Sequence, residues 1–357
     1  MASTIKVTDI AYPGSANTAI TINANDSVSM NGGVVSPQTG FKNRIINGGM
    51  TIDQRGGTVT SPSGSVVYGI DRWRIVRFND TTGTFTLQQS TTVPTGFKNS
   101  GLITVTADQT SVPSNGLYRL DQLIEGLNVL DLGWGTASAQ AVTIGFWVRS
   151  SVTGTYGARL CNSDENRSYV FQYTVNAANT YEYKTATIPG DTSGTWLTTN
   201  GIGIGLNFDL GSGSSFEGTA NAWNASNVCR ASGNVRLINT SGATFYITGV
   251  QLEKGSTATP FEFRSIGQEE YLCYRYFQRY SVSWRPYCEN GNFVSCFVPI
   301  QTMRVAPTAS RSGGSFTSCT FAALENITTN GFRYTLQGTS STMVEVLNDV
   351  TLLNGEL

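Results

Sequence analysis

Residues 168–175, SYVFQYTV, carry the clearest fold signal, because apolar side chains return at every second position. Four of them share one face of an extended backbone: Tyr169, Phe171, Tyr173 and Val175. A period of two is typical of a β-strand with one buried face. Residues 142–150, VTIGFWVRS, repeat the pattern and place Trp147 on the face opposite the apolar one. We therefore expect strands of a sandwich, with Trp147 in need of a cover or a ligand.

The composition extends this all-β prediction to the whole chain. Charged residues make up 13% of the 357 positions, against about 25% in an average protein. Val, Ile, Tyr and Phe fill short runs between turns rich in Gly, Ser, Thr and Asn. In residues 244–255, TFYITGVQLEKG, the apolar side chains change face at Gly249. This change predicts a β-bulge at that glycine.

One segment, residues 265–280, predicts a helix instead. Ser265 and Gln268 form the S-x-x-Q pattern of a capping box. The expected buried stripe of the helix consists of Leu272, Tyr276, Phe277 and Tyr280. Strand-like runs resume at Ser281, so we place a domain boundary at this helix.

Residues 1–42 offer only short alternating pieces broken by Pro-Gly and Asn-Gly turns. Their apolar surface is too small to bury a core of its own. We expect this segment to be disordered alone or to fold against other chains, for example as a stem or attachment tip in a homotrimer.

Several function classes are disfavoured by what the sequence lacks. The chain has no histidine, which removes Ser-His-Asp and Cys-His sites and the HExxH zinc site. A pair of carboxylates of the glycosidase kind stays open. A net charge of −1 without basic runs argues against nucleic acid, and no apolar stretch of about 18 residues indicates a membrane span. The six cysteines have no metal-binding or redox spacing and are expected to be free thiols in a cytosolic product.

Five segments carry a family resemblance: 43–56 (NRIINGGMTIDQRG), 71–73 (DRW), 142–160 (VTIGFWVRSSVTGTYGARL), 181–196 (YEYKTATIPGDTSGTW) and 245–280 (FYITGVQLEKGSTATPFEFRSIGQEEYLCYRYFQRY). In their order and spacing they resemble the jelly-roll modules of tailed-bacteriophage fibre proteins. Residues 296–310 (CFVPIQTMRVAPTAS) resemble the opening of the distal domain in such chains. The chain departs from the family at Tyr274, where Gln is usual, and residues 320–357 match no family pattern.

The residue patterns and the resemblance together predict four parts. These are an N-terminal attachment or stem segment (1–42), a jelly-roll β-sandwich similar to carbohydrate-binding modules (43–264), a connecting helix (265–280) and a smaller C-terminal β domain (281–357).

The function that the resemblance implies is that of a virion fibre protein of the tail-fibre, receptor-binding type. It would be a homotrimer, assembled in the host cytoplasm, bound to other virion proteins through residues 1–42, and it would recognise a host surface glycan without cleaving it. The alternatives are a structural head fibre, decoration or adaptor protein, and a glycan depolymerase. The absence of long parallel-strand repeats argues against the β-helix that usually hosts a depolymerase.

Charged residues stand out in the motif segments. Six are interpreted as structural ion pairs that hold strand ends rather than as catalytic groups: Asp53, Arg55, Asp71, Arg72, Glu253 and Arg264.

Glycan binding requires a flat apolar face beside hydrogen-bonding groups, because a sugar ring has apolar C–H faces and a polar rim. The candidates for this role are Trp134, Trp196, Trp223, Trp284 and Tyr287, each of which has core or subunit packing as its alternative. No enzyme activity, cofactor or metal is expected. A calcium ion at turn oxygens of Asp191 or Asp209 is the alternative, on jelly-roll analogy alone.

Overall fold

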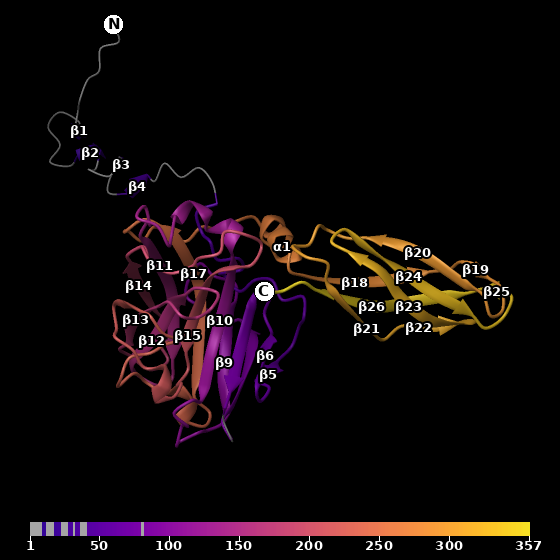
Figure 1. Cartoon of the computed structure of the whole chain (residues 1–357), viewed down its shortest axis with the longest axis horizontal. Coiled ribbons are helices and arrows are strands. Elements are labelled where there is room, and N and C mark those ends of the chain that lie inside the picture. Colours follow the sequence, from indigo (N-terminus) through magenta and orange to yellow (C-terminus); the bar gives the residue numbers. More distant parts are fainter. Residues whose placement is uncertain (1–8, 12–17, 23–27, 31–32, 36–40, 80–81) are drawn as a thin grey trace, which may run out of the picture.

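The computed structural model describes residues 9–11, 18–22, 28–30, 33–35, 41–79 and 82–357. Figure 1 shows a large β-sandwich beside a slender second β domain, with the helix α1 (Ile266–Tyr274) at their junction. No helix among the described residues has the length and apolar character needed to cross a membrane. Over the described ranges the structure is the predicted all-β fold with one α-helix.

Two antiparallel sheets form the sandwich. The seven-stranded sheet has the order β16-β13-β12-β15-β10-β7-β6. Its strands are β6 (Ser65–Tyr68), β7 (Trp73–Phe78), β10 (Leu117–Glu125), β12 (Gly154–Cys161), β13 (Ser168–Val175), β15 (Ile202–Asp209) and β16 (Ala222–Asn224). The six-stranded sheet has the order β14-β11-β17-β9-β8-β5 and consists of β5 (Val59–Thr60), β8 (Thr84–Ser90), β9 (Ser100–Ala107), β11 (Val142–Ser150), β14 (Glu182–Ile188) and β17 (Thr244–Lys254).

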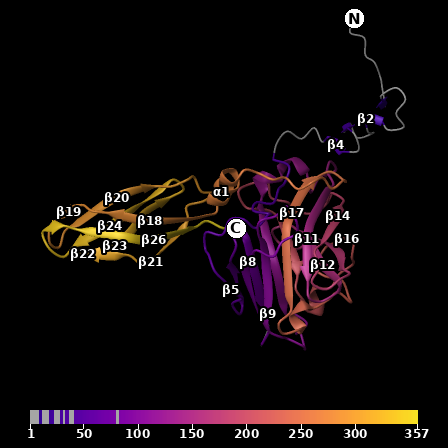
Figure 2. The ribbon, with the colours of Figure 1, turned by 180° about the vertical axis from the view of Figure 1, so that it is seen from behind.

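The chain passes repeatedly from one sheet to the other, as in a jelly roll. Figure 2 shows the strands of the six-stranded sheet in succession across the sandwich. Short 3-10 turns connect the strands at η1 (Gly126–Asn128), η2 (Leu130–Leu132), η3 (Ser214–Phe216) and η4 (Leu237–Asn239).

The core of the sandwich is built by the alternation that the sequence shows. In β13 the predicted apolar face is buried, and Tyr173 packs edge-on against Phe146 of β11 at 5.0 Å between ring centroids. Phe146 in turn contacts Phe208 of β15. Burying such aromatic rings supplies the main driving force for joining the two sheets.

The β-bulge predicted at Gly249 is confirmed. The pairing of β11 with β17 shifts register between Gly145 and Trp147, opposite this part of β17. Gly249 has φ +62°, a left-handed conformation that glycine adopts at little cost. The bulge explains why apolar residues on either side of Gly249 both face the core.

The helix begins where predicted and ends earlier. The Ser265 side chain accepts a hydrogen bond from the backbone N–H of Gln268, as expected for a cap. Residues 275–280 were predicted to continue the helix, and this was wrong. Phe277 already begins strand β18 (Phe277–Trp284). The reason is tertiary, because Phe277 to Val282 pair in antiparallel register with strand β26 (Glu345–Asn354), and this pairing overrides a run of aromatics compatible with both structures.

The C-terminal β domain has a separate core, which includes Phe332, Tyr334, Leu336 and Val346. One sheet has the order β18-β26-β21, with β22 also paired to β26, and it adds β21 (Thr308–Ser312) and β22 (Ser315–Thr317). The other has the order β20-β24-β23, with β20 (Phe293–Pro299), β23 (Cys319–Thr328) and β24 (Gly331–Gly338). A two-stranded ribbon consists of β19 (Tyr287–Cys288) and β25 (Thr342–Met343).

At the N-terminus, four short strands pair antiparallel in the order β1-β2-β3-β4: β1 (Asp9–Ala11), β2 (Thr18–Ile22), β3 (Val28–Met30) and β4 (Gly33–Val35). Most of the predicted attachment segment, residues 1–42, lies outside the described residues. Its role stays a prediction.

Candidate functional site

Trp147 lies on the outer face of the six-stranded sheet, as its position in the alternation predicts. It is half-buried and packs against Tyr183 of β14 at 5.4 Å between ring centroids. Tyr183 is 42% exposed. A side chain at Gly145 would meet the Tyr183 hydroxyl at 2.3 Å, so this ring lies over a glycine that leaves room for it. The rings of Trp147 and Tyr183 thus lie on the outer surface of the sheet, and neither is fully buried.

The bulge at Gly249 brings a third ring to this surface. A side chain built on Gly249 would lie 2.6 Å from Phe97 and 3.1 Å from Trp147, so both rings close over the bare glycine backbone. Phe97 belongs to the connection between β8 and β9. The contact therefore depends on the absence of a side chain at one position.

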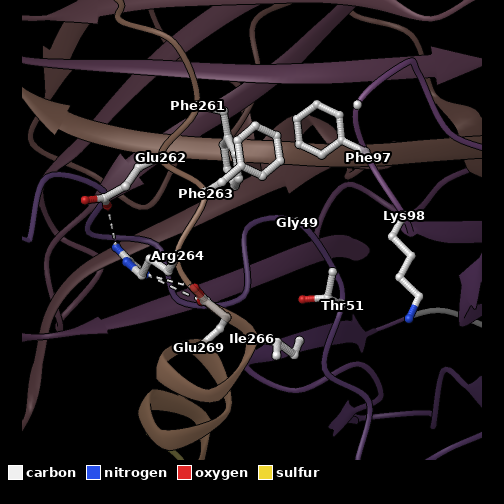
Figure 3. A pocket seen from close by; sticks show the side chains of 11 residues that line it. Gly49, Thr51, Phe97, Lys98, Phe261, Glu262, Phe263, Arg264, Ile266 and Glu269 are labelled. Carbon is white, nitrogen blue, oxygen red and sulfur yellow. Dashed lines mark hydrogen bonds and ion pairs between the residues drawn. The ribbon is translucent and has the colours of Figure 1, made fainter.

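Two more rings extend the surface toward helix α1. Phe261 and Phe263 follow β17 and contact each other at 4.9 Å, and each lies within 5.3 Å of Phe97. Figure 3 shows the three phenylalanines gathered on one side of a cavity of about 200 Å³. Phe263 is 66% exposed. We call Tyr183, Trp147, Phe97, Phe261 and Phe263 the aromatic strip.

Polar groups surround the aromatic strip. The cavity is also lined by Thr51, Lys98 and Ile266, and the Lys98 side chain is exposed. Burial, together with the negative charge of Glu253, raises the pKa of the Tyr183 phenol, so the phenol stays protonated at neutral pH. The strip thus combines apolar ring faces with a hydroxyl and an ammonium group.

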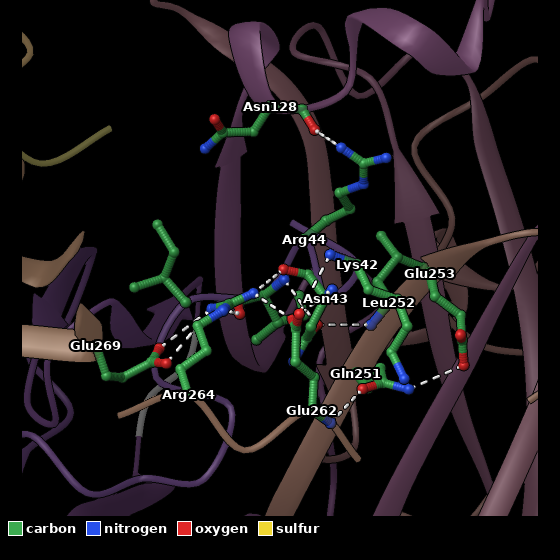
Figure 4. Close-up of polar contacts among 12 residues, drawn as sticks. Lys42, Asn43, Arg44, Asn128, Gln251, Leu252, Glu253, Glu262, Arg264 and Glu269 are labelled. Atoms are coloured by element: carbon green, nitrogen blue, oxygen red, sulfur yellow. Dashed lines mark hydrogen bonds and ion pairs between the residues drawn. The ribbon is translucent and has the colours of Figure 1, made fainter. Parts of the chain in front are cut away.

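A partly buried ion network positions the strip residues after β17. In residues 261–264 the side chains alternate, so Glu262 and Arg264 point to the side away from the rings of Phe261 and Phe263 (Figure 3). Arg264 bonds Glu262 at 3.0 Å and Glu269 of helix α1 at 3.4 Å, as Figure 4 shows. Glu262 also accepts the backbone N–H of Asn43 at 2.9 Å. The network ties the start of the sandwich to the segment that carries the aromatic rings.

Three predicted glycan-binding residues come together, but as packing rather than as a platform. Trp134, Trp196 and Trp223 form a cluster with centroid separations of 4.7 to 5.5 Å. Trp134 and Trp196 are 7% and 9% exposed, and Trp223 is half-buried. Each indole N–H donates to a backbone carbonyl, at Gln140, Ser193 and Pro189 respectively. The expectation of an exposed platform was wrong here, because the rings cover one another and their polar groups are already bonded.

The other two candidates lie in the C-terminal β domain. Trp284 is half-buried and packs against the core of that domain, and its role in glycan binding stays a prediction. Tyr287 is 58% exposed on β19, far from the aromatic strip (Figure 1). It stays a candidate in its own right.

Two of the predicted charged residues, Arg72 and Arg55, join the sandwich to the C-terminal β domain, and a third, Asp71, supports Arg55 within the sandwich. Arg72 is buried, has φ +72°, and pairs with Glu356, which follows β26. Its guanidinium also stacks on the ring of Tyr276 at 3.5 Å. Arg55 pairs with Glu356 at 3.2 Å and with Asp71 at 3.5 Å. We use the name latch for the group made up of Arg55, Asp71, Arg72, Tyr276 and Glu356.

The remaining charged candidates are bonded differently from the prediction. Asp53 accepts the backbone N–H of Gly56 at 2.9 Å, and Glu253 accepts the N–H and hydroxyl of Thr259. Neither makes an ion pair within the described part of the chain, so their assignment as ion pairs was wrong. Both carboxylates accept local donors of their own turns, a role that the residue type alone does not distinguish from ion pairing. Arg264 does form ion pairs, as described above.

The contacts of Asp191 and Asp209 do not favour a calcium ion at either carboxylate. Asp191 bonds Arg167 at 2.6 Å, and Asp209 lies 3.3 Å from Arg230. Both carboxylates therefore face arginines. Across the described ranges, no group of three or more His, Cys, Asp and Glu side chains could hold a metal ion.

Sequence reasoning found Trp147 but missed four strip residues: Tyr183, Phe97, Phe261 and Phe263. The signal available for the last two is the alternation in PFEF, residues 260–263. The closure of Phe97 over Gly249 has no local signal.

No protein-family model matches the chain, and no curated protein matches it in sequence. Among solved structures, the enzymatically active domain of tailspike protein 4 of bacteriophage CBA120 is similar at 12% identity with a TM-score of 0.33. That match covers 60% of this chain, and this chain spans only 21% of the tailspike chain.

Carbohydrate-binding modules are also similar. The family 11 module from Clostridium thermocellum, solved with a β-1,3-1,4-mixed-linked tetrasaccharide, has 13% identity and a TM-score of 0.28 over 54% of this chain and 92% of that one. The module TmCBM61, solved with β-1,4-galactotriose, has 10% identity and a TM-score of 0.28 over 60% of this chain and all of that one. The class that the strands themselves define is a jelly-roll β-sandwich followed by a smaller β domain.

Proposed function

We propose that this chain is a virion fibre protein of a bacteriophage that recognises a glycan on the host surface with its aromatic strip. The observation that carries the glycan part is the strip itself, in which rings from three parts of the sandwich are held outward beside hydroxyl and ammonium groups. Apolar ring faces stack on the C–H faces of a sugar, and the polar groups bond its hydroxyls.

The proposal includes binding without cleavage. The carboxylates nearest the strip cavity, Glu262 and Glu269, both bond Arg264. A glycosidase needs one carboxylic acid that can give up a proton and a second free carboxylate across the bond that is cleaved. Carboxylates neutralised by a buried arginine are suited to neither role.

The virion role rests on the resemblance of residues 43–280 to bacteriophage fibre modules. In this proposal three copies assemble, and residues 1–42 attach the fibre to other virion proteins. A structural head fibre or adaptor is the alternative, and in that case the aromatic strip would serve as a contact between protein subunits rather than with a sugar.

Binding of the full chain to host cells, and to polysaccharide purified from them, tests the proposal with Trp147→Ala and Tyr183→Ala. We expect the dissociation constant to rise about tenfold or more in each variant, as for a central contact. Phe293→Ala is the control, because Phe293 is an exposed aromatic ring on β20 that no prediction assigns to binding, and Tyr287→Ala tests the remaining candidate.

Three results would count against the proposal. Unchanged binding by both strip variants, with a loss of trimers in light scattering, assigns the strip to subunit contact. A loss of binding in Tyr287→Ala alone moves recognition to the C-terminal β domain. New reducing ends in the polysaccharide after incubation overturn the absence of cleavage.

A further inference from the structure

A second cavity lies between the sandwich and the C-terminal β domain. It has a volume of about 570 Å³. The sandwich contributes Arg55 and Tyr68, and the C-terminal β domain contributes residues of β18, β26 and β21. Figure 1 shows β6 turned toward these strands, with the C-terminus of the chain between them. We call this cavity the interdomain cleft.

On the wall of the interdomain cleft that the C-terminal β domain contributes, apolar and polar side chains are arranged in rows across three strands. Strand register places Arg279, Leu352 and Ser310 in one row across β18, β26 and β21. Val350 and Ser312 are partners in the row two residues further on, on the same face because side chains alternate. Leu352 and Val350 are half-buried, whereas both serines are exposed. The wall is therefore a small apolar floor with hydroxyl groups on one side and an arginine on the other.

The charges in the interdomain cleft are unbalanced. Among the residues that line it are two arginines, Arg55 and Arg279, and no Asp or Glu. Arg55 is already neutralised, because it pairs with Asp71 and Glu356 and stacks on Phe277 at 3.7 Å. Arg279 is exposed and makes no ion pair within the described part of the chain. One guanidinium thus faces the cleft without a counter-charge, in a protein whose net charge is −1.

We propose that the interdomain cleft binds a saccharide unit that carries an anionic group, either the carboxylate of a sugar acid or the phosphate of a sugar phosphate. Arg279 bonds the anion, because a guanidinium presents paired donors to such a group. The sugar ring lies over Leu352, and Ser310 bonds its hydroxyls. The inference rests on the proposed function only in taking the ligand to be a saccharide, and its site is separate from the aromatic strip.

Calorimetric titration of the full chain tests the inference with three probes: an oligogalacturonide, glucose 1-phosphate and a neutral galactose oligomer of matching length. We expect an acidic probe to bind and the neutral one to bind at least tenfold more weakly. Arg279→Gln should weaken the acidic probe by roughly tenfold or more, since a hydrogen bond to a charged group is lost. Preference for the oligogalacturonide assigns the anion as a carboxylate, and preference for glucose 1-phosphate assigns it as a phosphate.

Arg333→Gln is the matched control, because Arg333 is also an exposed arginine and lies on β24, in the other sheet of the same domain. It should bind the acidic probes as the unchanged protein does. Equal affinity for acidic and neutral probes, equal weakening by both substitutions, or no binding of either acidic probe overturns the inference.

A third variant separates this inference from the proposed function. Trp147→Ala should keep its affinity for the acidic probe if the interdomain cleft is the site. Loss of that affinity in Trp147→Ala, with Arg279→Gln unaffected, assigns the acidic probe to the aromatic strip and overturns the cleft. Binding of the acidic probe that depends on Arg279, in a protein that does not bind host cells, supports the cleft while the proposed function fails.

Discussion

Replacing Glu356 by Gln tests whether the latch holds the two domains together. The substitution keeps the shape of the side chain and removes its charge. Arg72 and Glu356 are 1% and 4% exposed at their side chains, so the pair is removed from water. Losing one partner of a buried pair costs about 3–5 kcal/mol, because the other charge stays buried without compensation.

Two features of the structure adjust that figure. The amide oxygen of the new Gln can still accept one hydrogen bond from Arg72, which returns about 1 kcal/mol. Arg55 keeps Asp71 as a partner, so it loses less than Arg72 does. The expected loss in the free energy of unfolding is therefore roughly 2–4 kcal/mol.

Urea denaturation followed by tryptophan fluorescence measures this loss, with the free energy extrapolated to water. Glu345→Gln is the control. Its partner Arg285 is 65% exposed at the side chain, and such pairs contribute under about 1 kcal/mol. If Glu356→Gln is destabilised no more than Glu345→Gln, the latch does not contribute to stability and the reasoning from burial is refuted.

Two further predictions concern Asp71 and Gly249. Burial raises the pKa of Asp71 to about 6 despite the nearby Arg55, so the folded state binds this proton more tightly than the unfolded state, and the stabilisation is lost as pH rises from about 4 to 6. Urea unfolding at several pH values measures this effect. Between pH 4 and 7 the free energy of unfolding should fall by up to ~3 kcal/mol more in the unchanged protein than in Asp71→Asn. An equal fall in both proteins would contradict the raised pKa of Asp71. Gly249→Ala should lose more stability than Gly233→Ala in the same measurement. Both glycines have positive φ, but only the methyl group at position 249 would meet Phe97. Equal losses would show that Phe97 can move away at little cost.

Local patterns predicted the parts of the fold that depend on neighbouring residues. The period of two in residues 168–175 gave strand β13, and the change of face at Gly249 gave the bulge. The outward position of Trp147 followed from the same alternation. These features are set by backbone geometry over a few residues, so they are readable without knowledge of the partner strands.

The candidate site could be predicted only in part, because its contacts join distant parts of the chain. Arg72 and Glu356 lie 284 residues apart, and no local signal pairs them. Residues 275–280 satisfied both helix and strand patterns until pairing with β26 decided between them. The tryptophans were ranked by residue type, but Trp134 is covered by two other rings, and only the closed sandwich determines which rings remain open.

The latch and the interdomain cleft share Arg55, so a substitution in the latch should also affect the cleft. Arg55 bonds Glu356 and also lies over Phe277, a wall residue of the cleft. Weakening the latch by Glu356→Gln should therefore reduce stability and acidic-probe binding together, because the two domains that form the cleft are no longer held in register. Arg279→Gln touches the ligand contact alone and should reduce binding at constant stability. If the interdomain cleft is the binding site, Arg72 and Glu356 of the latch should therefore affect binding through the position of the two domains, because neither residue lines the cleft.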